Sequence, residues 1–463
     1  MHSSRPPIVV ILGHVDHGKT TLLDYLRRTN IAAREAGGIT QSTRAFQLDT
    51  KVYGLMTFID TPGHVAFSSM RSRGSQIADL AVLVVAGDDG LKPQTIESIE
   101  FIKTARLPFL VAITKSDLPA ADPDRVKTQL TEHQVVVEDF GGDVPAVVIS
   151  AKTGAGVTDL IDIIHLLTEL HPTTADPQGP LEAVVLESRT SSQTGPSAVV
   201  VVKSGTLAVG QKLYQDQEIG KVRNLIDPDG HPVKSAPPST PIEIIGLSVI
   251  PPVGSSLYDH PGSSPVPAKL TPAASPQPDS LTLIIKADVA GSLEAVLAAL
   301  PAGVSVLFSG VGDVNETDID QAGTANCPVF GFNVKIPTGV AKLAEVNKVK
   351  IYSYKIIYEL LDQVQKLIHP LVTEKVLGQA QVIAEFKIDS DRIAGCRATS
   401  GIIGKGSQIR LLRGDLVIGE TKTRSLKSGK SDVQAVKSGS EFGAVFSPYL
   451  DFKIGDTITA FER

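Results

Sequence analysis

Apolar runs alternate with helical patterns along the first third of the chain. Five runs are short and continuously apolar, as buried strands are: 8–12 (IVVIL), 57–59, 80–85 (LAVLVV), 108–113 and 146–149. The stretches 20–28, 95–105, 124–133 and 157–170 instead space their apolar residues as helices do. Because such strand–helix repeats form parallel sheets covered on both faces, we predict a doubly wound, mostly parallel α/β domain over residues 1–173.

Short strands punctuated by Gly and Pro replace this alternation further along, and they predict a small β-barrel over residues 181–260. Residues 261–280 are rich in Pro, Ser and Ala and are predicted to form an exposed linker. Strand–helix alternation returns in a small α/β domain over 281–351, and helical spacing over 352–372 predicts a long connecting helix. The remaining segment, 373–463, is predicted to be a second β-barrel. The fold class is therefore multidomain, α/β and β.

Composition indicates a soluble, cytoplasmic protein. The chain has two cysteines, Cys327 and Cys396, too few for a disulfide framework or a multi-cysteine zinc site. No signal peptide is visible, and no apolar run approaches the roughly 18 residues of a membrane-spanning helix. No pattern indicates an oligomer, so we expect a monomer without membrane association.

Charge is unevenly distributed along the chain. The net charge is −6, yet the segment from Thr373 to the end has 14 Lys and Arg against 11 Asp and Glu. Four basic residues within nine positions have no acid among them: Lys422, Arg424, Lys427 and Lys430. This cluster fits either a solvated loop or an RNA contact.

Residues 13–20 read GHVDHGKT, which fits G-x-x-x-x-G-K-[ST] between a predicted strand and a predicted helix. Glycines let the backbone N–H groups of such a P-loop face the β-phosphate. Lys19 is assigned to the β- and γ-phosphates, and the Thr20 hydroxyl to Mg²⁺. The predicted nucleotide-binding residues of this segment are Gly13, His14, Val15, Asp16, His17, Gly18, Lys19, Thr20 and Thr21.

Three further motifs follow at strand ends. Asp60-Thr61-Pro62-Gly63 places a carboxylate where it can hold Mg²⁺ through water, and Gly63 can present its N–H to the γ-phosphate. Thr114-Lys115-Ser116-Asp117 offers an Asp that accepts the N1 and N2 hydrogens of guanine and a Lys that covers the base. Ser150, Ala151 and Lys152 would approach the O6 oxygen. Adenine lacks that donor pair, so the motifs predict GTP and GDP rather than ATP.

These motifs identify a resemblance to the translational GTPases, whose signatures include GHVDHGKT and the DTPGH of residues 60–64. The resemblance implies that His64 orients the hydrolytic water and that Val15 and Ile39 form an apolar gate. It also implies that Thr40 completes the Mg²⁺ coordination begun by Thr20 and Asp60. With Lys19 and Gly63, these give the expected catalytic set: His64, Lys19, Val15, Ile39 and Gly63.

Within that family, EAGGITQ at residues 35–41 is similar to bacterial initiation factor two, in a short form without its N-terminal extension. Gly205-Thr206-Leu207, Lys286-Ala287-Asp288 and Ala394-Gly395-Cys396 extend the likeness to the later domains. The resemblance implies that GTP-bound protein holds initiator (formyl)methionyl-tRNA on the small ribosomal subunit, promotes joining of the large subunit alongside other initiation factors, and hydrolyses GTP on the ribosome. The C-terminal barrel would grip the tRNA through Cys396, Arg424, Lys427, Lys430, Glu441, Phe442 and Gly443.

The sequence departs from the family in places. Thr114 replaces the usual Asn, Ser428 and Gly429 replace Arg and Tyr, and Phe442 stands where a Cys is expected. Losing an aromatic wall and a guanidinium would remove on the order of a few kcal/mol of aminoacyl recognition, which leaves formyl discrimination open. The alternatives are an elongation-type carrier of aminoacyl-tRNA and a ribosome-associated GTPase switch with altered tRNA specificity.

Overall fold

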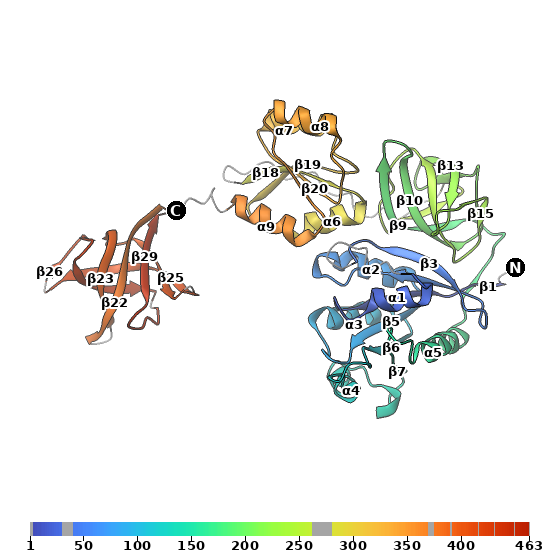
Figure 1. Ribbon diagram of the computed structural model, residues 1–463, viewed down its shortest axis with the longest axis horizontal. Coiled ribbons are helices and arrows are strands. Elements are labelled where there is room, and N and C mark those ends of the chain that lie inside the picture. Colours follow the sequence, from blue (N-terminus) through green and yellow to red (C-terminus); the bar gives the residue numbers. More distant parts are fainter. Residues whose placement is uncertain are drawn as a thin grey trace. The chain divides into compact units, whose positions relative to one another are not determined.

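The computed structural model describes residues 3–29, 40–261, 280–368, 375–388, 391–414, 416–429, 431–448 and 450–462. The chain divides into two compact units, Met1–Gln365 and Lys366–Arg463, and each is described by itself. The first unit contains an α/β domain, a barrel and a smaller α/β domain, and the second is a barrel (Figure 1). No helix in the described part of the chain is long and apolar enough to cross a membrane.

The first α/β domain has a six-stranded sheet with the order β3-β4-β2-β5-β6-β7. These strands are β2 (Ile8–Gly13), β3 (Arg44–Asp49), β4 (Leu55–Asp60), β5 (Leu80–Ala86), β6 (Phe109–Thr114) and β7 (Ala146–Val148). All neighbours are parallel except β3 and β4. The five predicted strands are present. The sequence did not predict β3, because this antiparallel edge strand is only partly buried and lacks a continuous apolar run.

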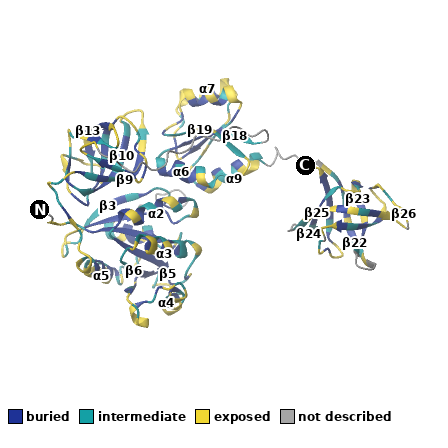
Figure 2. Ribbon diagram, turned by 180° about the vertical axis from the view of Figure 1, so that it is seen from behind, coloured by how far each residue is buried: buried dark blue, intermediate teal, exposed yellow. Residues whose placement is uncertain are grey.

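Helices cover both faces of this sheet: α1 (Lys19–Arg27), α2 (Ser68–Ile77), α3 (Pro93–Ala105), α4 (Pro123–Glu132) and α5 (Val157–Leu170). Alternate residues of β2 point to opposite faces, so Val10 packs in one core with α2, α3 and α4, and Ile11 in another with α1 and α5. Figure 2 shows the buried strands between helices with exposed outer faces. Short 3₁₀ turns lie at Val65–Phe67 and Glu138–Phe140.

Both barrels are closed by six strands in the same cyclic order. The first contains β9 (Glu182–Ser191), β10 (Gly195–Ser204), β12 (Lys212–Tyr214), β13 (Glu218–Ile226), β16 (Pro241–Leu247) and β17 (Ser256–Tyr258). The second contains β22 (Lys375–Ile388), β23 (Asp391–Gly404), β24 (Gln408–Arg413), β25 (Leu416–Ser428), β28 (Glu441–Ser447) and β29 (Thr457–Glu462). Numbered within each barrel, the order is 1-2-5-4-3-6, so the two domains share one topology.

Short strands accompany these sheets. The strands β14 (Pro232–Val233), β26 (Ser431–Asp432) and β27 (Ala435–Lys437) extend the barrels, whereas β1 (Ser3–Ser4) pairs with β8 (Thr174–Ala175) and β11 (Leu207–Ala208) with β15 (Ser235–Ala236) in separate two-stranded sheets.

The smaller α/β domain has four parallel strands in the order β19-β18-β20-β21. Its elements are β18 (Leu281–Ala287), α6 (Ala290–Ala299), β19 (Val304–Val311), α7 (Glu316–Ala325), β20 (Val329–Phe332), α8 (Thr338–Val346) and β21 (Ile351–Tyr354). The helix α9 (Ile357–Ile368) follows. Residues 262–279 of the expected linker lie outside the described residues.

The prediction of one helix over 352–372 is wrong at its start. Tyr352 to Tyr354 belong to β21, and the helix begins only at Ile357. The ring of Tyr352 stacks on Phe330 of β20, with centroids 5.0 Å apart, and the strand extends the parallel sheet. Helical spacing alone did not reveal this partner. Residues 369–372 lie outside the described part of the chain.

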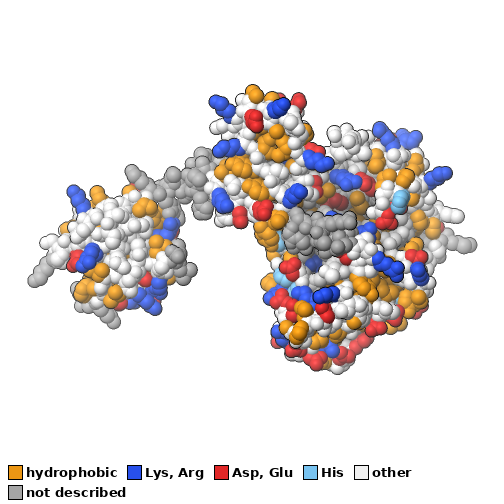
Figure 3. Space-filling model, viewed as in Figure 1, with side chains coloured by type: hydrophobic (Ala, Val, Ile, Leu, Met, Phe, Trp, Pro, Cys, Tyr) orange, Lys and Arg blue, Asp and Glu red, His pale blue; other side chains and the backbone are white. Residues whose placement is uncertain are grey.

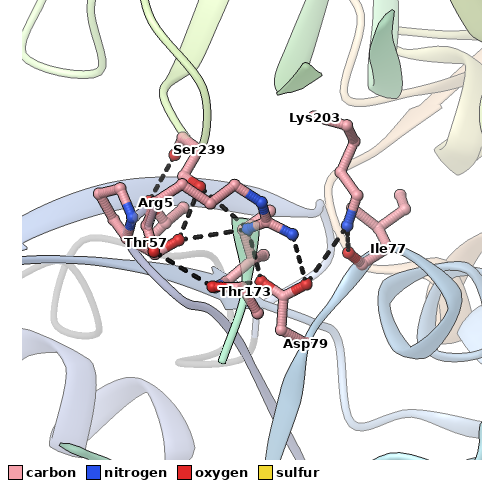
Figure 4. A network of polar contacts seen from close by, with 9 residues as sticks. Arg5, Thr57, Ile77, Asp79, Thr173, Lys203 and Ser239 are labelled. Atoms are coloured by element: carbon pink, nitrogen blue, oxygen red, sulfur yellow. Dashed lines mark hydrogen bonds and ion pairs between the residues drawn. The ribbon is translucent and has the colours of Figure 1, made fainter. Parts of the chain in front are cut away.

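A polar network fixes the first barrel to the α/β domain (Figure 4). Arg5 makes two hydrogen bonds to Asp79, at 2.6 and 2.7 Å, and a third to the Ser239 hydroxyl at 3.0 Å. The Thr57 hydroxyl of β4 donates to the Ser239 carbonyl, and Lys203 of β10 donates to the Ile77 carbonyl at the end of α2 at 2.7 Å. The barrel therefore holds both a sheet strand and the last residue of α2.

Candidate functional site

An open cavity of about 350 Å³ lies at the carboxyl ends of the parallel strands, where α1 begins. Such an edge is where open α/β sheets bind ligands. Its lining includes most of the predicted site residues: Val15, Asp16, Gly18, Lys19, Thr20, Thr21, Thr40, Gly63, His64, Thr114, Lys115, Asp117, Ala151 and Lys152. Gly13, His14, His17, Asp60 and Ser150 support this lining from neighbouring positions. Ile39 lies outside the described residues.

The P-loop geometry requires its glycines. Gly13 has a φ of +147°, and a Cβ there would overlap the Val84 carbonyl of β5. Gly18 precedes α1 with a φ of +88°, which favours glycine, and no side chain caps the helix start, where Lys19, Thr20 and Thr21 line the cavity. Positive φ at a helix start and unpaired N–H groups suit a bound anion.

Lys19 is almost fully buried at the start of α1, and its Nζ donates to the His14 carbonyl at 2.5 Å. Burial lowers the pKa of Lys19 to about 8, although the nearby Asp60 opposes this shift. A lysine that is this desolvated gains a charge partner when an anion enters the cavity. This arrangement suits a phosphate.

Oxygen atoms from three segments meet beside Lys19. The hydroxyls of Thr20 and Thr40 lie 2.7 Å apart, and Asp60 is 5% exposed at the end of β4. Hydroxyl and carboxylate oxygens are ligands that Mg²⁺ accepts, together with water and phosphate oxygens. The residues present therefore fit the predicted metal site.

The far end of the cavity is lined by Asp117, which Ser150 supports from a neighbouring position. The Ser150 hydroxyl donates to Asp117 Oδ1 at 2.7 Å, which lowers the pKa of Asp117 and keeps it ionised as a double acceptor. Thr114, which replaces an expected Asn, donates its hydroxyl to the His17 carbonyl at 2.6 Å. This bond ties the end of β6 to the P-loop. Lys115 lies 3.3 Å from Asp88 and has the positive φ of +59°.

His64 lies half-buried at the rim of the cavity. Its Nδ1 accepts a hydrogen bond from the Ala66 N–H at 3.0 Å, so the neutral ring carries its proton on Nε2. Burial, together with the positive Arg71, lowers the pKa of His64 below its usual range. The histidine is therefore neutral at pH 7, with Nδ1 held by the backbone and Nε2–H left to donate a hydrogen bond.

Arg71 is a positioning residue that no sequence pattern indicated. It lies fully buried on α2 and donates to the carbonyls of Pro62 (2.9 Å) and His64 (2.5 Å), on both sides of Gly63. A third bond of 2.5 Å reaches Glu97 on α3. The α2 sequence SSMRSRGSQI has too few apolar residues for a helical pattern, so neither the helix nor this arginine was predicted.

In the second unit, the predicted tRNA-binding residues divide into core and surface groups. Cys396 and Phe442 lie opposite each other on β23 and β28, and both are buried in the barrel core. Burial raises the pKa of the Cys396 thiol to about 12. Gly443 lies opposite Lys427 of β25.

Arg424, Lys427 and Glu441 are the exposed members of the set, and Glu441 pairs with Arg397 at 2.7 Å. Lys and Arg side chains gather where β25 lies (Figure 3). Lys430 lies outside the described residues.

Family models match most of the chain. The Elongation factor Tu GTP binding domain matches residues 4–169, Elongation factor G domain 2 matches 180–260, and Translation-initiation factor 2 matches 269–365. A solved structure, GDP-bound aIF5B from Aeropyrum pernix, is similar with a TM-score of 0.50 and 25% identity, covering 99% of this chain and 92% of that chain.

Relatives named translation initiation factor IF-2 match over 99% of the chain. Those of Desulforamulus reducens and Parvibaculum lavamentivorans are 44% and 41% identical, and the chain spans 50% and 56% of their lengths, about half. The relative from Halothermothrix orenii is 40% identical, and the chain spans 72% of it. The chain therefore belongs to the translation initiation factor IF-2 family.

Proposed function

We propose that the chain binds GTP and GDP with Mg²⁺ and hydrolyses GTP on the ribosome during translation initiation. The observation that carries this proposal is the cavity itself, which has a buried lysine and two hydroxyls at one end and an ionised Asp117 at the other. This placement of charged and polar groups at opposite ends of the cavity matches a ligand with phosphates at one end and a guanine base at the other. Residues that read phosphate and base thus lie in one cavity.

In this proposal the P-loop N–H groups and Lys19 hold the β- and γ-phosphates. Thr20, Thr40 and, through water, Asp60 would hold Mg²⁺, which supplies positive charge at the β- and γ-oxygens. His64 orients the attacking water, with Val15 and Ile39 as an apolar gate and the Gly63 N–H at the γ-phosphate. Residues 13–20 contain no arginine. Hydrolysis is therefore slow until the ribosome completes the site.

We further propose that the protein is a cytoplasmic monomer that places initiator tRNA on the small ribosomal subunit and promotes large-subunit joining, together with other initiation factors. The names of its relatives support initiation over an elongation-type carrier. So does the match of residues 269–365 to Translation-initiation factor 2, which includes the smaller α/β domain. Arg424, Lys427 and Lys430 would face the tRNA.

Nucleotide specificity is tested by Asp117→Asn. An Asn side chain cannot accept two hydrogens from guanine, but it can donate one to the C2 oxygen of xanthine. We expect GTP affinity to fall by about a hundredfold or more and xanthosine triphosphate affinity to rise, because a buried donor–acceptor mismatch has that effect. Unchanged GTP affinity would contradict the assignment of Asp117. Asp124→Asn, on the exposed side of α4, is the matched control.

The hydrolytic and tRNA steps have separate tests. His64→Ala should abolish ribosome-stimulated hydrolysis while GTP affinity stays constant. Titration of the full chain with formylated and unformylated initiator methionyl-tRNA at fixed salt tests the C-terminal barrel. A preference for the formylated form supports initiator recognition. Equal or absent binding favours a ribosome-associated switch. That outcome would fit the burial of the Cys396 and Phe442 side chains, which lie in the core rather than on the surface.

A further inference from the structure

The ring of His64 contacts an aromatic residue from a distant part of the sequence. Tyr358, in the first turn of α9, packs edge-to-face on it, with ring centroids 4.2 Å apart and an interplanar angle of 87°. Phe67 flanks the same ring at 6.1 Å. Ala66 and Phe67 lie within three residues of His64 and move with it. Tyr358 belongs to another domain, so its contact can be made or lost independently.

The start of α9 is also bound by the segment that carries Thr40. The Gln41 side chain donates from Nε2 to the Lys355 carbonyl at 2.8 Å and accepts the Ile357 N–H at its Oε1, at 3.2 Å. The Ile357 N–H is one of the first amides of the helix, which have no partner within the helix. Gln41 therefore caps α9 from the nucleotide domain and fixes the position of Tyr358 over His64.

Tyr358 is not needed to anchor its own helix. The buried residues of α9 are Ile357, Leu360 and Val364, which share one helical face. Tyr358 lies off that face and remains 46% exposed, despite its contact with His64. Replacing its ring should therefore leave α9 in place. A purely structural role in packing α9 would not explain why an exposed tyrosine ring lies against a half-buried histidine.

We propose that Tyr358 is a positioning residue that restrains the His64 ring and keeps hydrolysis slow until α9 moves. This inference rests on the proposed role of His64 in hydrolysis. While Tyr358 packs on it at 4.2 Å, the imidazole cannot swing away without losing this edge-to-face contact. The helix α9 leads directly into the second unit, which begins at Lys366, so a partner that repositions this helix would release the histidine.

The test is single-turnover hydrolysis of saturating GTP by the full chain without ribosomes. Tyr358→Ala should raise the rate about three- to tenfold, the factor that one aromatic contact contributes to an equilibrium. Tyr358→Leu should raise it too, because leucine lacks the ring that makes the contact, even though its bulk is similar. Tyr358→Phe should behave as the unsubstituted chain, since the contact is between rings. Glu359→Ala, an exposed neighbour on the same helix, is the matched control and should have no effect.

Dependence on His64 separates this proposal from a general loosening of the structure. Combining Tyr358→Ala with His64→Ala should remove the rate increase, and the His64 ring resonances in NMR spectra should shift in Tyr358→Ala but not in Glu359→Ala. An unchanged or lower rate in Tyr358→Ala, an equal increase without His64, or unshifted resonances would each overturn the proposal. If His64→Ala alone left ribosome-stimulated hydrolysis intact, the proposed function would fail instead.

Discussion

Arg71→Ala is the substitution that most directly tests how the loop carrying His64 is held. The guanidinium makes three hydrogen bonds, two to backbone carbonyls beside Gly63 and one to Glu97. Breaking a buried ion pair by removing one partner destabilises a protein by about 3–5 kcal/mol. Glu97 is 28% exposed and can regain water, so we expect the low end, about 3 kcal/mol. For a domain of about 150–250 residues, such as the first α/β domain, a loss of about 3 kcal/mol lowers the melting temperature by about 6–12 °C.

We expect Arg71→Ala to lower the rate of GTP hydrolysis by more than the loss of folded protein alone would. Losing the bonds to Pro62 and His64 frees the loop that places the histidine, and a displacement of about 1 Å lowers rates by about a hundredfold. Arg71→Lys should be intermediate, because an ammonium cannot reach all three acceptors in the same planar geometry. Calorimetry with bound GDP and ribosome-stimulated hydrolysis provide the two measurements.

Arg73→Ala is the matched control for this experiment. Arg73 lies on the same helix but pairs with Glu294 of the smaller α/β domain, so its loss should leave the loop in place. The reasoning is refuted if Arg71→Ala melts within about 1 °C of the unsubstituted chain and hydrolyses GTP at the same ribosome-stimulated rate.

Three other outcomes are expected. GTP affinity, measured by calorimetry, should be constant below about pH 7 and about tenfold weaker at pH 9, because free Lys19, whose pKa is about 8, loses its proton over this range and binding must restore it; equal affinities would contradict this. Gly63→Ala should weaken GTP more than GDP in nucleotide titrations, since its Cβ would overlap Lys19 Nζ and lie 2.8 Å from Val15 N. In thermal unfolding of the full chain, Phe442→Ala should destabilise the C-terminal barrel by about 3–5 kcal/mol, whereas Glu441→Ala, from an exposed ion pair, should change it by less than about 1 kcal/mol.

Most of the α/β core was predictable because its strands are buried on both faces. Runs such as IVVIL and LAVLVV have no polar interruption and gave β2 and β5 directly. Elements stabilised mainly by polar or tertiary contacts were not predictable. The helix α2 buries Arg71, Gly74 and Ser75 between Met70 and Ile77, so its buried face is not a continuous apolar stripe. The strand β21 was mistaken for helix because its sheet partner is distant in sequence.

The candidate site shows the same division. Motifs with fixed spacing indicated most of the residues that line the cavity, because the backbone geometry of a P-loop depends on local sequence. Arg71 and Tyr358 belong to no motif, since each acts through a contact that exists only once distant elements have packed. The sequence could not separate the buried Phe442 from the exposed Lys427 either, because the resemblance indicates positions and not side-chain directions.

The helix α2 connects the loop of residues 60–64 with the two other domains of the first unit. At its start it holds the loop of residues 60–64 through Arg71, and Arg73 pairs with Glu294 of the smaller α/β domain. At its end, Lys203 of the barrel binds the Ile77 carbonyl. If a shift of the loop around Gly63 alters these contacts, a partner whose binding moves the other two domains changes GTP affinity, and GTP changes the affinity of that partner by the same factor. Substituting Arg73 or Lys203 should accordingly change how strongly a distant ligand affects GTP binding, even though neither residue touches the nucleotide cavity.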